Sequence, residues 1–209
     1  ELVQLIKEES AAFTINRDKI NQYVEDERKV SAYTQFYLPT NMPKLYFLLD
    51  RIVCLHGEDF LKRLSANVFV DIGSGPGTFS LALLFYLNEK KYPLPAIYLI
   101  DRSRLMLNQA EKIIKYFFPA IELRISLNEL SLTPDKTYSL FFGHSLNELS
   151  VQLQDNYINI AFKNTNVSDV FWIEPGTPTF FQQQIRLREQ LLKEKFSVLY
   201  PCPSSDQCP

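Results

Sequence analysis

An apolar segment that runs directly into a glycine-rich turn constrains the fold of this chain more than any other feature. Residues 68–78 read Val-Phe-Val-Asp-Ile-Gly-Ser-Gly-Pro-Gly-Thr. The first residues are β-branched or aromatic, as a buried parallel strand requires. Gly73, Gly75 and Gly77 have no Cβ, so the backbone can turn sharply and a ligand can lie against it. Because residues 79–87 then read as a helix whose N-terminal amides face the turn, the segment predicts a nucleotide-binding strand–turn–helix unit.

The spacing of the glycines narrows the class of ligand. A dinucleotide-binding turn has the pattern G-x-G-x-x-G, whereas here the third glycine comes one residue early and Thr78 takes its place. A P-loop is excluded, because no Gly-Lys-Ser/Thr follows. Asp71 would repel a pyrophosphate but attract an ammonium group, and Asp101, after a second apolar segment, can accept hydrogen bonds from both ribose hydroxyls. This combination resembles the class I S-adenosylmethionine (SAM) methyltransferases; the alternative is that the glycines only shape a tight turn.

Apolar strand patterns alternate with helix patterns through the rest of the chain. The expected strands are residues 67–72, 96–100, 121–125, 138–143 and 169–173, with residues 196–200 as a candidate sixth strand. The expected helices are residues 79–88, 103–118, 147–163 and 178–195. Alternation on this scale indicates βαβ units. We therefore predict an α/β fold with a doubly wound, mostly parallel Rossmann-like sheet, and the resemblance implies that this is the class I methyltransferase fold.

The residues before the first strand predict a helical extension outside the sheet. Charges are dense up to about residue 30, which indicates one or two amphipathic helices. Pro39 and Pro43 predict a helix break, followed by a long helix that packs on the domain. The expected division is an N-terminal helical extension at 1–64, a SAM-binding methyltransferase-like domain at 65–200, and the start of a cysteine-containing, apparently truncated tail at 201–209.

In a doubly wound sheet the ligand lies at the carboxyl ends of the strands, where the strand order reverses. Polar residues and glycines end or follow the predicted strands, so we expect them to meet at this edge. Ser126 and Leu127 are candidates for contact with the edge of the adenine ring, or else belong to an ordinary loop. The predicted cofactor-binding residues are Asp71, Gly73, Ser74, Gly75, Gly77, Asp101, Arg102, Ser126, Leu127 and Gly143.

Catalytic residues are harder to identify in this sequence. The segment after the fourth predicted strand lacks the Asn/Asp-Pro-Pro-aromatic pattern of methyltransferases that act on the amino nitrogens of bases. His144 is a candidate general base, or else a loop residue or a helix-start residue beside the cofactor carboxylate. Glu174 is a second candidate, which either touches substrate or bonds turn amides. No cysteine nucleophile is evident, because Cys54 precedes the first strand.

Composition and charge exclude several classes of protein. The net charge of −2 argues against tight non-specific binding to DNA, although it permits a local basic face for RNA. The sequence contains no run of about 18 apolar residues, so it predicts no membrane-spanning helix. Three cysteines, two of them near the end of the chain, do not make a secreted disulfide framework, which favours an intracellular, reducing compartment. Glu1 rather than Met begins the sequence, which leaves room for an upstream targeting segment.

The tail carries two cysteines, each followed by proline, with five residues between them. Two such thiolates can bind one metal site, but a structural zinc or an iron–sulfur cluster normally needs four ligands. Together with five other motifs, the tail resembles the methyltransferase-like family associated with the mitochondrial small ribosomal subunit and its bacterial relatives. The motifs are Ala32-Tyr33…Leu38-Pro39, Asp71-Ile72-Gly73-Ser74-Gly75-Pro76-Gly77-Thr78, Leu146-Asn147-Glu148-Leu149, Glu174-Pro175-Gly176-Thr177-Pro178, Arg188…Leu191-Leu192 and Pro201-Cys202-Pro203…Cys208-Pro209.

The resemblance implies a SAM site, a role in assembly of the small ribosomal subunit or contact with rRNA, and a four-cysteine iron–sulfur site. Cys202 and Cys208 would be two of the four cluster ligands. Two positions depart from the family pattern: Ser204 stands where a histidine is usual, and Tyr37 where an arginine is common. The sequence also stops at Pro209, before the remaining cysteines, so this tail alone cannot complete a cluster.

Three functions remain open at this point. The first is a SAM-binding, methyltransferase-like factor of the small ribosomal subunit, without turnover. The second is an active methyltransferase of rRNA, protein or a small molecule. The third is an interaction protein with a vestigial SAM pocket. Asp71 and Asp101 argue against a vestigial SAM pocket. The missing acceptor motif favours a SAM-binding factor without turnover over an active methyltransferase. The expected location is the bacterial cytoplasm or the mitochondrial matrix, and the sequence does not define the acceptor or the oligomeric state.

Overall fold

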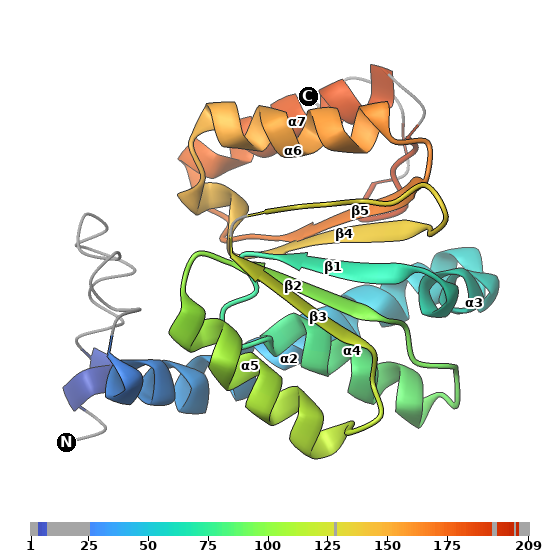
Figure 1. The fold of residues 1–209 in the computed structure, drawn as a ribbon. Helices are drawn as coiled ribbons and strands as arrows, with labels where there is room; N and C mark the ends of the chain where they lie inside the picture. The colour runs from blue at the N-terminus through green and yellow to red at the C-terminus, as the bar shows by residue number, and fades with distance from the viewer. Residues whose placement is uncertain (1–3, 8–25, 128, 194–195, 203, 205–209) are drawn as a thin grey trace.

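Five parallel strands form one sheet in the order β3-β2-β1-β4-β5 in the computed structural model of the chain (Figure 1). The structure describes residues 4–7, 26–127, 129–193, 196–202 and 204. The strands are β1 Val68–Ile72, β2 Ile97–Asp101, β3 Leu123–Leu127, β4 Tyr138–Gly143 and β5 Val167–Ile173. Each neighbouring pair of these strands is parallel, which confirms the predicted α/β fold.

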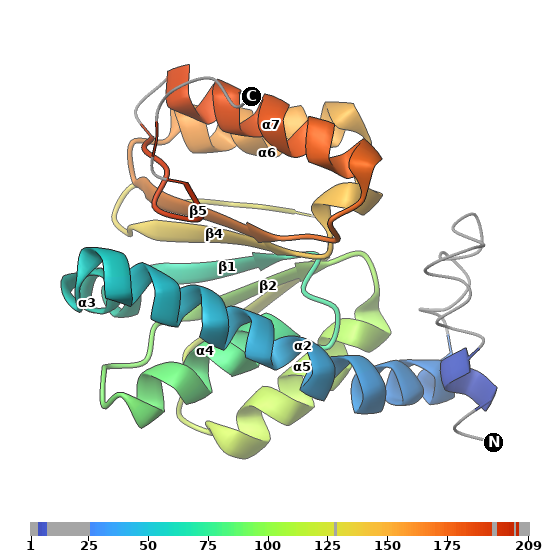
Figure 2. The same ribbon diagram turned by 180° about the vertical axis from the view of Figure 1, so that it is seen from behind.

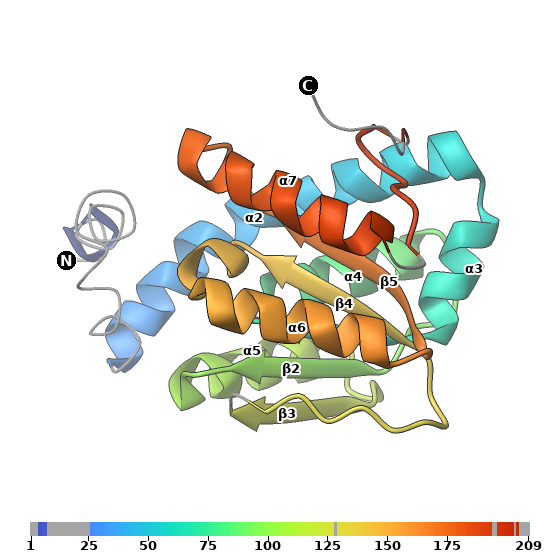
Figure 3. The same cartoon turned by 90° about the horizontal axis from the view of Figure 1, so that it is seen from above.

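Helices cover both faces of the sheet (Figures 1 and 2). One face carries α2, α4 and α5, and the other carries α6 and α7, which Figure 3 shows from above. The helices are α2 Glu27–His56, α3 Asp59–Ala66, α4 Thr78–Glu89, α5 Arg104–Phe117, α6 Val151–Lys163 and α7 Pro178–Lys193, with a short 3-10 helix, η2, at Leu146–Glu148. Within the described ranges, no helix combines the length and the apolar character needed to cross a membrane.

The central strands are buried on both faces, which explains why they read as continuous apolar runs. Phe69 of β1 packs on Phe141 of β4, with ring centroids 5.3 Å apart, in a core cluster shared with α2, α4 and α5. Val70 and Ile72 belong to a second cluster, shared with α6 and α7. This alternation follows from the two-residue period of a strand. Asp71 therefore lies on the same face of β1 as Phe69, the face covered by α2 and α4.

The connections place the switch in strand order between β1 and β4. From β1 the chain moves outward through β2 to β3, and it then returns to the other side of β1 to form β4 and β5. The loops that follow β1 and β4 consequently leave the sheet in opposite directions. A crevice forms between such loops at the carboxyl ends of the strands.

The predicted helix break at Pro39 and Pro43 is wrong, because both prolines lie inside the continuous helix α2. A proline removes one hydrogen bond and crowds the carbonyl four residues earlier. Here Gln35, Pro39 and Pro43 all lie on the exposed side of α2, so the carbonyls that lose a partner face water. The Thr40 hydroxyl also donates to the Phe36 carbonyl at 2.8 Å within this stretch.

Other boundaries differ for local reasons. The predicted sixth strand at residues 196–200 is wrong, because these residues form no strand. The Leu199 carbonyl lies 3.0 Å from Nε2 of His56, and the Leu199 side chain packs on the core beside α2. Strand β3 begins two residues later than predicted, since the Ile121 carbonyl accepts from Lys115 Nζ at 2.6 Å. Helix α6 begins at Val151 and not Asn147, because Ser150 caps it. Most of the expected amphipathic helices before residue 26 lie outside the described residues.

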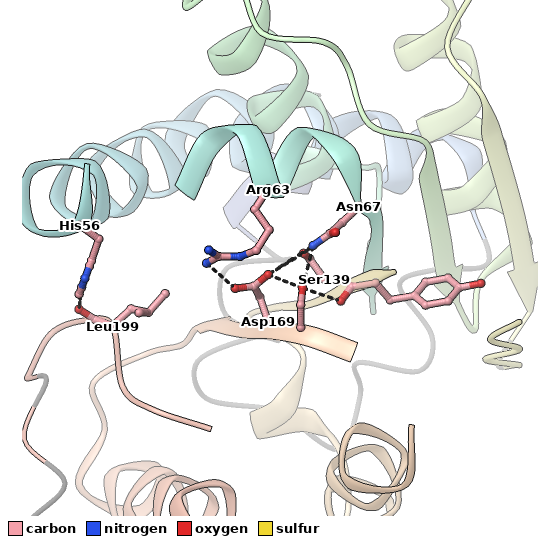
Figure 4. A network of polar contacts seen from close by, with 8 residues as sticks. His56, Arg63, Asn67, Ser139, Asp169 and Leu199 are labelled. Carbon is pink, nitrogen blue, oxygen red and sulfur yellow. Dashed lines mark hydrogen bonds and ion pairs between the residues drawn. The ribbon is translucent and has the colours of Figure 1, made fainter. Parts of the chain in front are cut away.

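A buried polar network ties α3 and the start of β1 to β4 and β5 at the amino ends of the strands (Figure 4). Asp169 is 6% exposed and accepts from Arg63 at 3.1 Å and from the Ser168 hydroxyl at 2.6 Å. The Asn67 amide donates to the Ser139 hydroxyl at 2.9 Å. These bonds satisfy polar groups that would otherwise be costly to bury, so we interpret the network as structural.

Candidate functional site

The glycine turn leads from β1 into α4 with left-handed backbone angles. Gly73 has φ of 70° and a Cβ on it would lie 2.4 Å from Cβ of Ser145, so the turn and the loop after β4 touch at this position. Gly75, with φ of 52°, has no described atom within 4 Å of the equivalent position. Gly77, also left-handed, precedes α4 where α5 packs closely. Two of the three glycines are thus explained by packing, and Gly75 is the one that leaves room for a ligand.

Two polar side chains at this turn are buried and incompletely bonded. Asp71 is 1% exposed, and its Oδ2 accepts from the hydroxyl of Ser80 at 2.7 Å and from its amide at 3.2 Å. Neither Asp71 Oδ1 nor Ser74 Oγ has a hydrogen-bond partner among the residues that the structure describes. Burial, with a smaller effect of the Asp101 charge, raises the pKa of Asp71 to about 7. Unpaired buried oxygens are costly, so this turn suits a ligand that supplies hydrogen-bond donors.

Asp101 reaches the same turn from the end of β2. One carboxylate oxygen accepts from the Gly75 amide at 2.8 Å and the other from the Ser103 amide at 2.8 Å. Burial raises the pKa of Asp101, and these two amide bonds oppose the shift. Each carboxylate oxygen can accept a further bond. The predicted meeting of Asp71, the glycine turn and Asp101 at one edge is therefore what the structure shows.

The ends of β2 and β3 complete this side of the crevice. The strand register places Leu127 opposite Asp101 and Ser126 opposite Ile100. Leu127 is 36% exposed, which leaves an apolar surface beside the acid. Arg102 follows Asp101 and lies 3.9 Å from Glu148 of η2. Because η2 follows β4, this ion pair crosses the carboxyl end of β1 and links the two sides of the switch point.

Gly143, at the end of β4, is required by packing. A Cβ at this position would lie 2.1 Å from Cδ2 of Phe79, far inside van der Waals contact. Phe79 is 4% exposed and packs on Phe141, with centroids 5.0 Å apart. No open space for a ligand adjoins the Gly143 Cα on this side, so its predicted cofactor contact remains a prediction.

His144, the next residue, is held away from general-base chemistry. Its backbone is left-handed, with φ of 58°, and its amide donates to the Ile173 carbonyl at 2.8 Å. Its Nε2 lies 2.9 Å from Nζ of Lys44. Burial and the Lys44 charge lower the pKa of His144 to about 4. The imidazole is therefore neutral near pH 7 and accepts from Lys44, so its basic lone pair is already occupied.

Glu174, after β5, bonds amides instead of pointing to an open acceptor site. One oxygen accepts from the Leu146 backbone amide at 2.7 Å, and the other accepts from the Asn147 side chain at 2.8 Å. Burial raises the pKa of Glu174 to about 8. Between the two alternatives drawn from the sequence, the structure shows bonding to amides, and these belong to the loop after β4. Glu174 thereby fixes one wall of the crevice.

The sequence reasoning missed three contributors to this edge. Ser80 bonds Asp71, and the Ser145 hydroxyl donates to the Ile72 carbonyl at 2.6 Å. Ser80 had a local signal, because it lies in the first turn of the helix after the glycines. No local sequence signal indicated Lys44, since it lies 100 residues before its partner His144.

Two hollows on the surface of the described residues lie away from this edge. One, of about 110 Å³, lies at the amino ends of β1, β2 and β4, beside Tyr98 and Arg124. The other, of about 450 Å³, lies between α2 and residues 200–201. The assignment of the site therefore rests on sheet topology and on the unpaired polar atoms of the turn.

The cysteines do not assemble a metal site within the described residues. Cys54 and Cys202 are exposed free thiols. Among the residues that the structure describes, no group of three or more His, Cys, Asp or Glu side chains could hold a metal ion. Cys208, the other predicted ligand, lies outside the described residues.

Solved structures with a similar fold are methyltransferases by description. A candidate SAM-dependent methyltransferase from Methanococcus maripaludis is 15% identical, with a TM-score of 0.50 over 77% of this chain and 71% of that chain. At this identity the similarity establishes the fold alone. Magnesium protoporphyrin IX methyltransferase from Synechocystis PCC 6803, solved with bound S-adenosylhomocysteine (SAH), is 12% identical, with a TM-score of 0.47 over 84% of this chain and 74% of that chain. A search of curated protein sequences found no match.

The family model is the informative comparison. The model described as "Mitochondrial small ribosomal subunit Rsm22" matches residues 27–209, which include α2, the whole sheet and the tail. The match covers most of the chain and confirms the resemblance seen in the motifs. The chain therefore belongs to the mitochondrial small ribosomal subunit Rsm22 family.

Proposed function

We propose that this chain binds SAM at the carboxyl ends of β1 and β2 and acts as a methyltransferase-like factor of the small ribosomal subunit. The observation that carries the proposal is the pair of buried, unpartnered oxygens at the turn, Asp71 Oδ1 and Ser74 Oγ. Ser74 directly precedes Gly75, where no described atom lies within 4 Å of the position of a Cβ. Carboxylates at the ends of two adjacent strands favour a cationic, hydroxyl-bearing ligand over a phosphate-bearing one.

The residues present fit SAM part by part. Asp101 retains acceptor capacity on both oxygens for the ribose hydroxyls. Leu127 and Ser126 border the adenine, Leu127 offering an exposed apolar surface. Asp71 contributes negative charge where the amino group of the methionyl part lies. When bound, SAM supplies an activated methyl group; the chain supplies binding and orientation.

The state of the acceptor side favours binding without turnover. His144 and Glu174, the two candidate bases, are both engaged, by Lys44 and by the loop after β4. An acceptor held in line with an activated methyl group can still react through proximity alone. Active methyl transfer is therefore the second candidate, and an interaction protein with a vestigial pocket is the third.

The family description supports the partner and the location. We propose that the chain associates with the small ribosomal subunit in the mitochondrial matrix, with rRNA as the contact surface. Two basic residues, on α5 and on α7, are already engaged, since Lys115 bonds the Ile121 carbonyl and Arg186 pairs with Asp155. Arg104 and Lys112 of α5 are candidates for contact with the phosphates of rRNA, since neither forms an ion pair with another described residue.

An iron–sulfur cluster is implied by the resemblance, with Cys202 and Cys208 as two ligands. The described residues do not fit a complete cluster, because Cys202 lies exposed without further ligands around it. We therefore derive no step from such a group. Absorption spectra of a longer, anaerobically purified protein test it, and a colourless protein would contradict the implication.

Calorimetric titration with SAM tests the cofactor site. We expect the wild-type chain to bind SAM, and Asp101→Ala to weaken binding by at least about tenfold, since each charge-assisted hydrogen bond contributes about 1.5–3 kcal/mol. Asp59→Ala is a matched control, because Asp59 is an exposed acid on α3, at the opposite end of the sheet. Circular dichroism shows whether each variant is folded. Absence of SAM binding by the folded wild-type chain would refute the proposal.

A second experiment separates binding from turnover. Labelled SAM is incubated with small ribosomal subunits isolated from cells that lack this protein. Transfer of label by the wild-type chain, and not by Asp101→Ala, would establish the second candidate function. Co-sedimentation with the subunit without transfer is the result that we expect.

A further inference from the structure

Lys44 brings a positive charge to the carboxyl edge of the sheet from outside the βαβ units. It lies within α2, whose N-terminal half extends past the carboxyl ends of the strands (Figures 1 and 3). Its Nζ lies 2.9 Å from Nε2 of His144, the residue directly after β4. The ammonium group is therefore placed beside β4, the strand that adjoins β1 at the switch point.

A chain of contacts connects Lys44 to the glycine turn. The His144 ring lies 5.9 Å from the ring of Phe79 in the first turn of α4, and Phe79 packs on Phe141. Phe141 is the register partner of Asp71 in β1. Asp71 and α2 share one face of the sheet, so Lys44 reaches the carboxyl edge from the face that the Asp71 side chain also occupies.

The charge of Lys44 has no acidic partner in the described part of the chain. No carboxylate there forms an ion pair with its Nζ, and its recorded partner is a neutral imidazole. Lys44 is exposed overall, and partial burial of its ammonium group lowers its pKa, as expected where an anion does not offset the lost water. By contrast, Arg102, the cation next to Asp101, already pairs with Glu148. An arriving anion would complete the coordination of Lys44.

We propose that Lys44 binds the carboxylate of the methionyl part of SAM, with His144 positioning its ammonium group. The methionyl part carries an amino and a carboxylate group on one carbon, so its site needs a negative and a positive protein group close together. Asp71 supplies the first and Lys44 the second. The inference rests on the proposed function, since it assigns a contact within the same cofactor site.

The experiment compares SAM with decarboxylated SAM, which retains the adenosine, the sulfonium and the amino group but lacks the carboxylate. We expect the wild-type chain to bind SAM about 10- to 100-fold more tightly, the range for loss of a hydrogen bond between charged groups. Lys44→Met keeps the length of the side chain without its charge and should bind both ligands equally. Lys44→Arg should restore part of the preference. Lys62→Met, an exposed lysine on α3, should leave the preference unchanged.

The outcomes separate this inference from the proposed function. If the wild-type chain binds neither ligand, both the proposed function and the role of Lys44 are refuted. If it binds both with equal affinity, the cofactor site stands and the role of Lys44 is refuted, even if Lys44→Met does not fold. A preference for SAM that persists in folded Lys44→Met also refutes the role. A preference present in the wild type and lost in Lys44→Met establishes it.

Discussion

Replacing Gly143 with alanine tests whether packing, more than ligand contact, requires a glycine at the end of β4. The new Cβ would lie 2.1 and 2.2 Å from two carbons of the Phe79 ring and 3.0 Å from Phe141. Ordinary contact begins near 3.4 Å, so the ring must move by more than an ångström. The ring has little freedom, since Phe79 is 4% exposed and Phe141 is 0% exposed.

The expected cost is a decrease in the free energy of unfolding by about 1–3 kcal/mol, the usual range for overpacking a core. Backbone strain does not contribute, because Gly143 is not left-handed. Gly176→Ala is the matched control: Gly176 has no atom within 4 Å of a new Cβ and no positive φ. That substitution should be neutral or stabilising by up to about 1 kcal/mol, through the entropy of the unfolded chain.

Urea denaturation of the single variants and the double variant measures the coupling. Phe79→Ala alone should cost about 3–5 kcal/mol. In that background Gly143→Ala should cost much less, because the Phe79 ring is gone and Phe141, 3.0 Å from the new Cβ, can move into the space that it leaves. The reasoning is refuted if Gly143→Ala is as mild as Gly176→Ala, or if its cost persists without the Phe79 ring.

Three further predictions concern stability. Asp71→Asn should abolish a pH dependence of the unfolding free energy. Because the pKa of Asp71 is raised in the fold, its protonated carboxyl stabilises the fold fully below pH 3.8, the ordinary pKa. This stabilisation is lost as the pH rises through about 7. The unfolding free energy of the wild type relative to Asp71→Asn should therefore fall by up to about 4 kcal/mol between pH 3 and pH 8, and a constant difference would contradict it. Asp169→Ala should lower the unfolding free energy by about 1–3 kcal/mol, because it leaves buried donors unpaired. Arg63→Ala should lower it by under about 1 kcal/mol, since Arg63 is half exposed. Equal losses in urea denaturation would contradict the structural role of the network in Figure 4. Pro39→Ala should raise the melting temperature, since it restores a helical hydrogen bond within α2, and a lower value would show that the proline shapes the helix.

Much of the fold was predictable because its signals are local. Strand β1 carries apolar residues on both faces, and Ser103, at the start of the expected helix 103–118, caps α5. The left-handed turn at Gly75 favours a residue without Cβ, so the glycine in the sequence predicts the turn. The edge where Asp71 and Asp101 meet then follows from parallel strands, whose carboxyl ends point the same way.

The errors came from positions where distant groups override a local preference. Pro39 breaks helices in isolation, but α2 continues through it because Leu45, Leu49 and Ile52 anchor the following turns in the core. Residues 196–200 have strand-like composition, yet contact with α2 displaces them from the sheet. Propensity describes a few neighbouring residues and does not include such contacts.

The sequence by itself determined the class of fold, the glycine turn and the two acids of the cofactor site, because each depends on residues within one strand–turn–helix unit. Only the tertiary structure decided that Lys44 meets His144, that Glu174 holds the loop after β4, and that Gly143 makes room for Phe79. These contacts join residues 27 to 100 positions apart along the chain. Their partners are chosen by how α2, β4 and β5 pack around β1, and no local pattern specifies that packing.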